Sequence, residues 1–260
     1  MARVAMAAAA HPDDIEFMMA GTLILLGEAG YELHYMNIAN GSCGSATMTK
    51  QQTIDTRTGE AHAAAALIGA TCHPPIVDDL EILYEQSLVR RLCATVREVQ
   101  PEILLLPSPQ DYMEDHMNAC RLMVTAAFCR NMRNYATDPS VPPIDNEMAI
   151  YHALPWGLMD QLRQPIRPDF LVDTTSVIKK KRDMLACHRS QKEWLDESQG
   201  HDNYLNTMEQ MSELVAGLVG GFTHAEGWRR HSHLGFGPEE FDPLRDALGA
   251  LTLTFDKGDR

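Results

Sequence analysis

Short apolar runs alternate with longer segments of helical periodicity through the first half of the chain. The apolar runs predict strands at Val4 to Ala10, Tyr31 to Ala39, Ile76 to Leu80 and Ile103 to Pro107. The segments between them predict helices at Ile15 to Gly30, Thr53 to Gly69 and Leu83 to Val99. This alternation is typical of right-handed βαβ units, which build a parallel sheet flanked by helices.

The second half of the chain continues the α/β pattern with longer connections. It predicts helices at Asn118 to Tyr135, Val177 to Cys187 and His201 to Gly221, and strands at Met148 to Leu154 and Phe170 to Asp173. The residues after Thr223 are too mixed to assign. We therefore expect one domain, residues 1–260, with a Rossmann-like, mostly parallel sheet between helices. The apolar stretch Leu248 to Phe255 predicts pairing with another subunit, so a homo-oligomer is expected.

The charge and cysteine content narrows the choice of partner and compartment. The chain has 36 acidic and 22 basic residues and a formal net charge of -14, which opposes binding to nucleic acid or to an anionic membrane. Six cysteines without a CxxC pair suit reduced thiols, so we expect a cytoplasmic protein. No apolar run approaches the roughly 20 residues that span a bilayer. A small molecule is the expected partner, and membrane insertion is not expected.

Three polar clusters follow predicted strands, at the edge where parallel sheets bind ligands. They are His11 to Asp14, Asn40 to Ser45 and Ser108 to His116. The second cluster has too few glycines in register for a dinucleotide-binding turn, and it follows the wrong strand. We expect it to form a substrate-side loop that includes Ser42, with Arg57 nearby.

The first and third clusters contain the side chains that a catalytic zinc requires. Such a site has three protein ligands, an open position for water and a carboxylate that takes the proton of the water. His11 and Asp14 are candidate ligands from one loop, His116 is the third, and Asp13 is the candidate general base. Spacing alone leaves an alternative open, because an Asp before a helix is commonly an N-cap.

The same residues resemble a known family. The segment Ala8-Ala9-Ala10-His11-Pro12-Asp13-Asp14-Ile15-Glu16 is similar to the N-terminal signature of the LmbE-like, or PIG-L, N-deacetylases, in which an apolar strand runs into His-Pro-Asp-Asp-x-Glu. Further blocks resemble the family at Arg57 and Glu60, Asp115-His116, Lys180, Ser190-Gln191 and Ala225-Glu226-Gly227. The similarity extends over nearly the whole chain.

The resemblance implies a metal-dependent amide hydrolase that removes an N-acetyl group, usually from an amino sugar. It implies Zn2+ on His11, Asp14 and His116, with Asp13 as general base. Zinc lowers the pKa of bound water toward about 7 and polarises the amide carbonyl. The same ligand set leaves iron or manganese as alternatives. The other expected catalytic residues are Asp115 and Tyr112. The expected substrate-binding residues are Arg57, Ser42 and Glu226.

One position departs from the family pattern. Many members have His-Pro-Asp-His in the second motif, where the first His assists the oxyanion, but this chain has Met113-Glu114-Asp115-His116. A thioether donates no hydrogen bond, so another donor is needed or the substrate differs. The candidate donors are Tyr112, His188, His224, His231 and His233.

Two further patterns have simpler interpretations than a functional site. His231-Ser232-His233 lacks an evident third ligand, which favours exposed or hydrogen-bonded histidines over a metal pair. The run Lys179 to Arg182 predicts a solvated helix face, with Lys180 as an alternative phosphate contact. For the whole chain, hydrolysis of a different amide and a catalytically silent ligand-binding protein remain the alternative functions.

Overall fold

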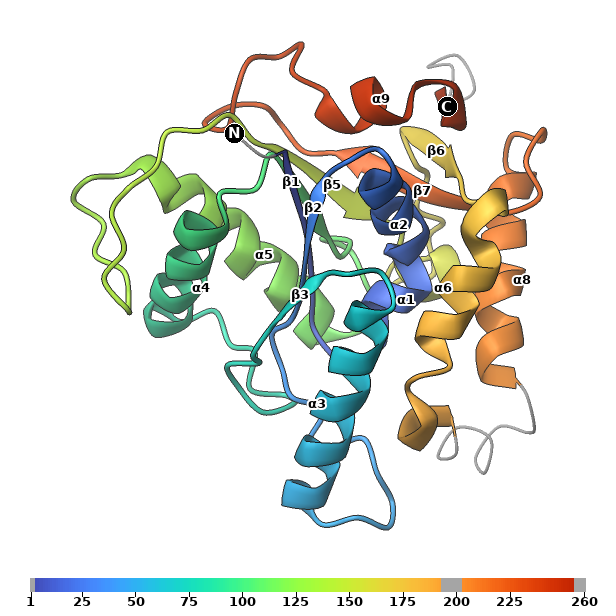
Figure 1. Cartoon of the computed structure of the whole chain (residues 1–260), viewed down its shortest axis with the longest axis horizontal. Helices are drawn as coiled ribbons and strands as arrows, with labels where there is room; N and C mark the ends of the chain where they lie inside the picture. The colour runs from blue at the N-terminus through green and yellow to red at the C-terminus, as the bar shows by residue number, and fades with distance from the viewer. Residues whose placement is uncertain (1–2, 193–202, 255–260) are drawn as a thin grey trace.

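Eight strands form one sheet in the computed structural model, which describes residues 3–192 and 203–254 (Figure 1). The strands are β1 (Val4–Ala9), β2 (Glu32–Asn37), β3 (Thr71–His73), β4 (Ile103–Leu106), β5 (Ala149–Ala153), β6 (Phe170–Asp173), β7 (Ala225–Arg230) and β8 (Thr252–Thr254). Their order across the sheet is β3-β2-β1-β4-β5-β7-β6-β8. The pairs from β3 to β5 are parallel, whereas β7 pairs antiparallel with β5 and β6, and β8 pairs antiparallel with β6. The mostly parallel α/β fold predicted from the sequence is confirmed.

Helices cover both faces of the sheet (Figure 1). One face is covered by α4 (Gln86–Val99) and α5 (Glu114–Phe128). The other carries α1 (Asp14–Met18), α2 (Ala20–Glu28), α3 (Lys50–Ala66), α6 (Ile178–Leu185) and α9 (Pro243–Leu248). Helix α8 (Asn203–Gly217) packs in separate clusters, against Leu171 of β6 and Ala225 of β7 and against α1 and α6. Strand β1 lies between the two layers, so its side chains are buried on both sides, Ala7 in one core and Met6 in the other. This double burial explains why β1 is a continuous apolar run.

Three predicted elements differ from the structure near the site. The helix expected from Ile15 to Gly30 is interrupted at Met19, whose φ of -135° separates α1 from α2. No strand forms at 76–80 in this described part of the chain, where Val77 makes only an isolated bridge to Ala39. The apolar side chains of that segment pack against the α4 and α5 core as a loop, and β3 lies earlier in the chain. Helix α5 begins four residues before the predicted start, so His116 lies on its first turn.

The unassigned C-terminal region completes the sheet. Strand β7 lies between β5 and β6, and β8 pairs with β6. Thr252 to Thr254, in the stretch predicted to pair with another subunit, pair with β6 as the last strand of their own sheet, while Leu248 packs in the core. Pairing of this stretch with another subunit stays a prediction. Residue 255 lies outside the described residues, as do 201 and 202 of the predicted helix that corresponds to α8.

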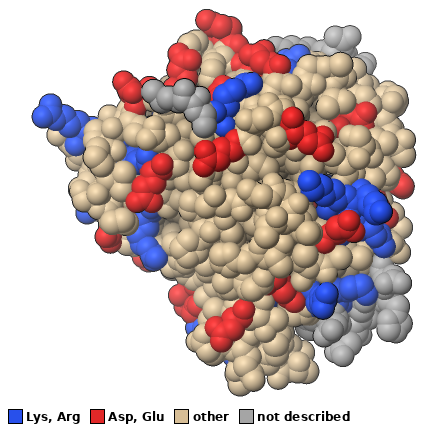
Figure 2. Space-filling model, in the orientation of Figure 1, with Lys and Arg blue, Asp and Glu red and all other residues tan. Residues whose placement is uncertain are grey.

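The surface agrees with the mixed charge of the sequence. On the face shown in Figure 2, acidic and basic side chains are interspersed. Within residues 3–192 and 203–254, none of the helices combines the length and the apolar character needed to cross a membrane.

Candidate metal centre and active site

The candidate site begins in the tight loop between β1 and α1. Pro12 and Asp13 turn the chain there, and Asp13 has a φ of 103°, a conformation that non-glycine residues rarely adopt. The backbone N–H of His11 donates to Asp14 Oδ2 at 2.7 Å, and Asn37 at the end of β2 donates from Nδ2 to the His11 carbonyl at 2.6 Å. Asp13 makes no side-chain cap for α1, so the helix-capping alternative is wrong for its carboxylate. The unusual backbone orients Asp13 for another purpose.

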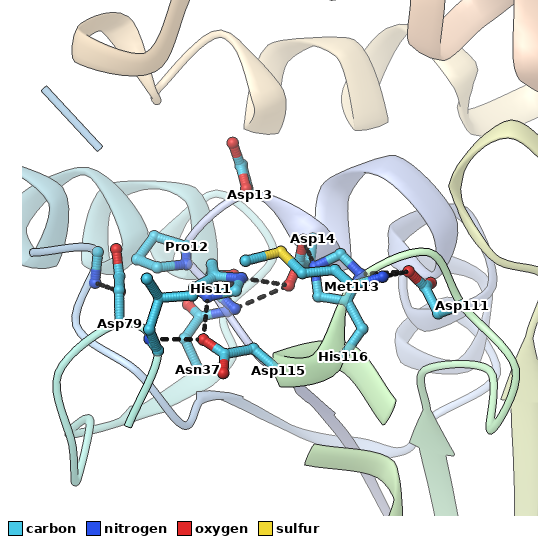
Figure 3. A network of polar contacts seen from close by, with 12 residues as sticks. His11, Pro12, Asp13, Asp14, Asn37, Asp79, Asp111, Met113, Asp115 and His116 are labelled. Carbon is cyan, nitrogen blue, oxygen red and sulfur yellow. Dashed lines mark hydrogen bonds and ion pairs between the residues drawn. The ribbon is translucent and has the colours of Figure 1, made fainter. Parts of the chain in front are cut away.

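Three side chains expected to bind metal lie close together. One nitrogen or oxygen from each of His11, Asp14 and His116 falls within 4.8 Å of the others. His11 Nδ1 lies 3.5 Å from Asp14 Oδ2, and His116 Nε2 lies 3.4 Å from Asp14 Oδ1. Figure 3 shows the three side chains converging from the loop after β1 and from α5. Two imidazoles and a carboxylate form a donor set that suits a divalent transition metal.

Each histidine of this group is held by a carboxylate on its other ring nitrogen. His11 Nε2 lies 2.9 Å from Asp115 Oδ2, and His116 Nδ1 lies 2.9 Å from Asp111 Oδ1. Asp115 Oδ2 also accepts from the backbone N–H of Leu80 at 2.7 Å. Carboxylates placed in this way fix the ring orientation and the tautomer of metal-binding histidines. Asp115, expected among the catalytic residues, thus contacts His11 through the ring nitrogen that faces away from Asp14.

The protonation of the group reflects its concentrated negative charge. Burial lowers the pKa of His11, but its contacts with Asp115 and Asp14 outweigh burial and raise the pKa to about 10. Burial also lowers the pKa of His116, but the contacts with Asp14 and Asp111 outweigh burial, so the pKa of His116 is raised. The pKa of Asp14 is lowered because the two histidines outweigh the effect of burial. The environment therefore favours a cation between these three side chains, and a metal ion would take the place of the protons.

Asp13 occupies a different environment beside the histidines. It points away from His11 and Asp14 in Figure 3. Its Oδ2 accepts a hydrogen bond of 2.7 Å from the Tyr204 hydroxyl and lies 3.7 Å from Arg57 Nη2. Burial raises the pKa of Asp13, the Arg57 charge opposes that rise, and the net shift is upward. A carboxyl with a raised pKa, held by two neighbours, is suited to exchanging protons with water or substrate.

Arg57 joins the loop after β2 to the loop after β1. Its Nη2 donates to the Pro12 carbonyl at 2.6 Å and its Nη1 to the Gly41 carbonyl at 3.3 Å. A Cβ at Gly44 would lie 2.2 Å from Nη1, so only glycine leaves room for the guanidinium there. Ser42, expected to bind substrate, instead accepts a hydrogen bond from the backbone of Asp79, which stabilises the loop. Its neighbours Cys43 and Gly44 line the cavity.

These groups open into a cavity of about 450 Å3. The lining includes His11, Asp13, Asp14, His116, Arg57, Asp79, Asp111, Tyr112, Met113, Phe17, Leu154, Trp156, Gln191 and Tyr204. Phe17 packs edge-on against Trp156 and Tyr204, with ring centroids 4.7 and 5.1 Å away, and forms an aromatic wall. The cavity therefore places an apolar wall beside the carboxylates and imidazoles, an arrangement found in small-molecule sites.

Comparison with known proteins finds a family model that matches the N-terminal part of the chain. Residues 6–128 match the PIG-L family model, described as GlcNAc-PI de-N-acetylase. This part of the chain is therefore similar to the PIG-L family. The matched part contains the candidate metal group, Asp13, Arg57 and both outer carboxylates, whereas Tyr204 and Trp156 lie beyond it.

The relatives of this chain include two kinds of enzyme. It is 28% identical over 198 residues to 4-oxalmesaconate hydratase of Pseudomonas putida, with 72% of this chain and 73% of that protein covered. It is 24% identical over 229 residues to diacetylchitobiose deacetylase of Thermococcus kodakarensis, with 84% and 79% covered. The solved structure of N,N'-diacetylchitobiose deacetylase from Pyrococcus horikoshii has a TM-score of 0.75 at 20% identity, with 94% of this chain and 89% of that chain covered, and so shares the fold.

The position that departs from the PIG-L pattern faces the cavity. Met113 and Tyr112 both line it, and the Tyr112 ring stands edge-on to His116 with centroids 5.6 Å apart. Burial and nearby carboxylates raise the pKa of Tyr112 to about 12, so its hydroxyl stays protonated at neutral pH. Of the candidate donors considered for the position of Met113, Tyr112 lines the cavity, whereas His188, His224, His231 and His233 are not among its described lining residues.

Glu226, expected to bind substrate, lies elsewhere in the fold. It accepts hydrogen bonds of 2.7 Å from the backbone N–H groups of Gly21 and Thr22, and from Lys181 Nζ. Lys181 has no exposed side-chain surface, so the solvated face predicted for its helix is wrong at this position. Glu226 thus ties α2 to α6 and β7, while Lys180 is exposed. A buried charge can be retained when it is fully paired in this way.

Two residues of the site were missed by sequence reasoning. Asp111 was not singled out because nothing in its local spacing distinguishes it from Asp115. Tyr204 was missed because 191 positions separate it from Asp13. A carboxylate five positions before a candidate ligand histidine was the one usable signal for Asp111.

Proposed function

We propose that this chain is a metal-dependent hydrolase that removes an N-acetyl group from an amino sugar or a related small molecule. The match of residues 6–128 to the PIG-L family and the deacetylase relative support a hydrolytic enzyme of this kind. The observation that carries the proposal is the convergence of His11, Asp14 and His116 in one cavity beside the buried Asp13. Zinc is the metal we propose, because the donor set suits it and both imidazoles are already oriented by carboxylates.

The residues around the metal group have complementary roles in this proposal. Zinc, when bound, supplies Lewis acidity that acidifies water and polarises the amide carbonyl. Asp13 takes a proton from the attacking water and returns it to the nitrogen of the leaving amine. Arg57 and Tyr204 hold the Asp13 carboxylate in position. Tyr112 donates a hydrogen bond to the developing oxyanion, in place of the histidine that Met113 replaces.

The cavity lining favours a neutral or cationic substrate. Its described residues include four aspartates, Asp13, Asp14, Asp79 and Asp111, against one arginine, Arg57. Even with the charge of a bound Zn2+ and that of Arg57 counted, the four carboxylates outweigh the positive charge, so a multiply anionic molecule would be repelled and a neutral amide would not. The aromatic wall of Phe17, Trp156 and Tyr204 is an apolar surface against which the carbon skeleton of a sugar ring packs.

A second candidate is the hydration of a carbon–carbon double bond in a carboxylated substrate. The 28% identity to a hydratase favours it, and so does Met113, since this position lacks the donor of the family pattern. Both reactions add water to an unsaturated carbon and require the same proton transfer by Asp13. The four aspartates of the cavity oppose the carboxylated substrate, so we rank deacetylation first.

One experiment separates these functions. Metal content is measured on the purified protein and on His11→Ala, and the metal-loaded protein is then offered N-acetylglucosamine conjugates and conjugated unsaturated dicarboxylates. Release of free amine would support deacetylation. Loss of the ultraviolet absorbance of the conjugated double bonds in the dicarboxylate would support hydration. Bound metal without turnover of either would favour a different amide or a silent binding protein. Absence of metal from a folded, zinc-supplemented sample would overturn the proposal.

We also propose that the protein works in the cytoplasm as a homo-oligomer. The six cysteines are free thiols, which suits a reducing compartment. Sedimentation of the purified protein as a monomer would exclude the oligomer.

A further inference from the structure

A second cavity of about 370 Å3 lies between α5 and the end of β7. Its walls include Tyr84, Arg121, Thr125, Arg229 and His231, with His152 beneath them. No described residue lines both this cavity and the candidate active site. It is therefore a separate feature of the molecule.

The cavity differs from the rest of this acidic chain in its charge. Arg121 and Arg229 both line it, and its described lining contains no carboxylate. Arg121 lies over the Tyr84 ring, 4.9 Å from the centroid, and Arg229 donates to the side-chain oxygen of Gln110 at 3.0 Å. Among residues 3–192 and 203–254, neither guanidinium forms an ion pair with an acidic side chain. Two guanidiniums without counter-charge remain available to an anion.

A third arginine and the two histidines do not supply this charge. Arg230 borders the cavity, but its guanidinium donates to the Phe241 carbonyl and lies 3.9 Å from Asp242. His152 Nε2 lies 2.9 Å from His231 Nδ1, and His152 Nδ1 lies 3.1 Å from the Pro107 carbonyl. Burial lowers the pKa of His152 to about 4 and also lowers that of His231, so both rings are neutral near pH 7. The positive charge of the cavity therefore comes from Arg121 and Arg229.

We propose that this cavity binds the carboxylate or phosphate group of a small anionic ligand through Arg121 and Arg229. The planar guanidinium matches both oxyanions with paired N–H donors. A volume of about 370 Å3 falls within the range of small-molecule pockets. The neutral Gln110 amide that Arg229 holds is a weaker partner than an anion, so a ligand would replace it.

The test is calorimetric titration of the metal-loaded protein with inorganic phosphate and, separately, with succinate. We expect saturable binding of at least one of them, weakened about tenfold or more in R121Q/R229Q. The control R133Q/R163Q removes two exposed arginines elsewhere and should change the affinity less than about twofold. Circular dichroism and thermal midpoints establish that each variant is folded.

The location of the anion is tested separately. Crystals soaked in selenate should show anomalous density between the two guanidiniums. Equal affinity in R121Q/R229Q and the unchanged protein would overturn the proposal, because the anion would then bind elsewhere, for example at the metal. Absence of binding by both phosphate and succinate would overturn it as well.

Discussion

The Tyr204 hydroxyl donates a hydrogen bond of 2.7 Å to Asp13 Oδ2, joining two residues that are 191 positions apart. Tyr204 reaches the site from α8, and its ring packs edge-on against Phe17 of α1. Burial and the Asp13 charge raise the pKa of Tyr204 well above its usual value, so it acts as a donor. The orientation of Asp13 thus depends on a helix that lies outside the part matched by the family model.

Tyr204→Phe should therefore lower kcat while leaving metal content unchanged. The ring and its packing remain, but Asp13 loses a hydrogen bond worth about 1.5–3 kcal/mol, which corresponds to a loss of about 10- to 160-fold. Turnover and metal content are measured on the same preparation. Tyr84→Phe, which removes an exposed hydroxyl outside the site, is the control. Unchanged kcat in Tyr204→Phe would show that this contact does not position the base.

Asp13→Asn should retain the metal and lose most turnover. The amide keeps the shape of the side chain but takes no proton from water, and removal of a general base typically costs about 100- to 10,000-fold in rate. The measurement is single-turnover kinetics on metal-loaded protein. Normal turnover in this variant would assign the proton transfer to another residue.

The outer carboxylates should control metal affinity. Asp111→Asn and Asp115→Asn each remove a negative charge that orients a candidate ligand histidine, and loss of such a partner lowers affinity about 10- to 100-fold. Competition with a chromogenic chelator measures the change. Glu114→Gln, an exposed neighbour on the same helix, should leave the affinity unchanged. If all three variants behaved alike, a general loss of negative charge would explain the result.

Gly44→Ala should disturb the site through Arg57. The new Cβ would clash with Nη1 of Arg57 and lie 3.0 Å from the Gln191 side-chain oxygen, so the guanidinium must leave its present position beside Asp13. We expect kcat/KM to fall about tenfold or more, since small displacements of positioning groups are costly. Gly59→Ala is the matched control, because a Cβ there meets nothing within 4 Å and alanine favours a helix.

Lys181→Met should act on stability, with little effect on substrate affinity. It leaves Glu226 buried without its cation, and breaking a buried pair lowers the free energy of unfolding by about 3–5 kcal/mol. Denaturant unfolding measures this change. Lys180→Met, at the exposed neighbouring position, should change it by less than about 0.5 kcal/mol. A raised KM with unchanged stability would instead return Glu226 to substrate binding.

The local pattern of the sequence was sufficient for much of the fold. Strand β1 and the loop from His11 to Asp14 were predictable because burial on both faces leaves an apolar run, and neighbours in one tight loop remain neighbours in space. Strand β6 matched its prediction from Phe170 to Asp173. The strand predicted at 76–80 was wrong because apolar side chains that pack as a loop show the same pattern as a strand.

By itself, the sequence determined the α/β class and the grouping of His11, Asp13 and Asp14, since both depend on short-range periodicity and spacing. Only the tertiary structure decided that Asp115 holds His11, that Tyr204 holds Asp13, and that Lys181 is buried on Glu226. The physical reason is that the partners within each long-range contact come from different strands and helices, and their meeting depends on the order of strands in the sheet. A contact between distant segments leaves no periodicity in either one.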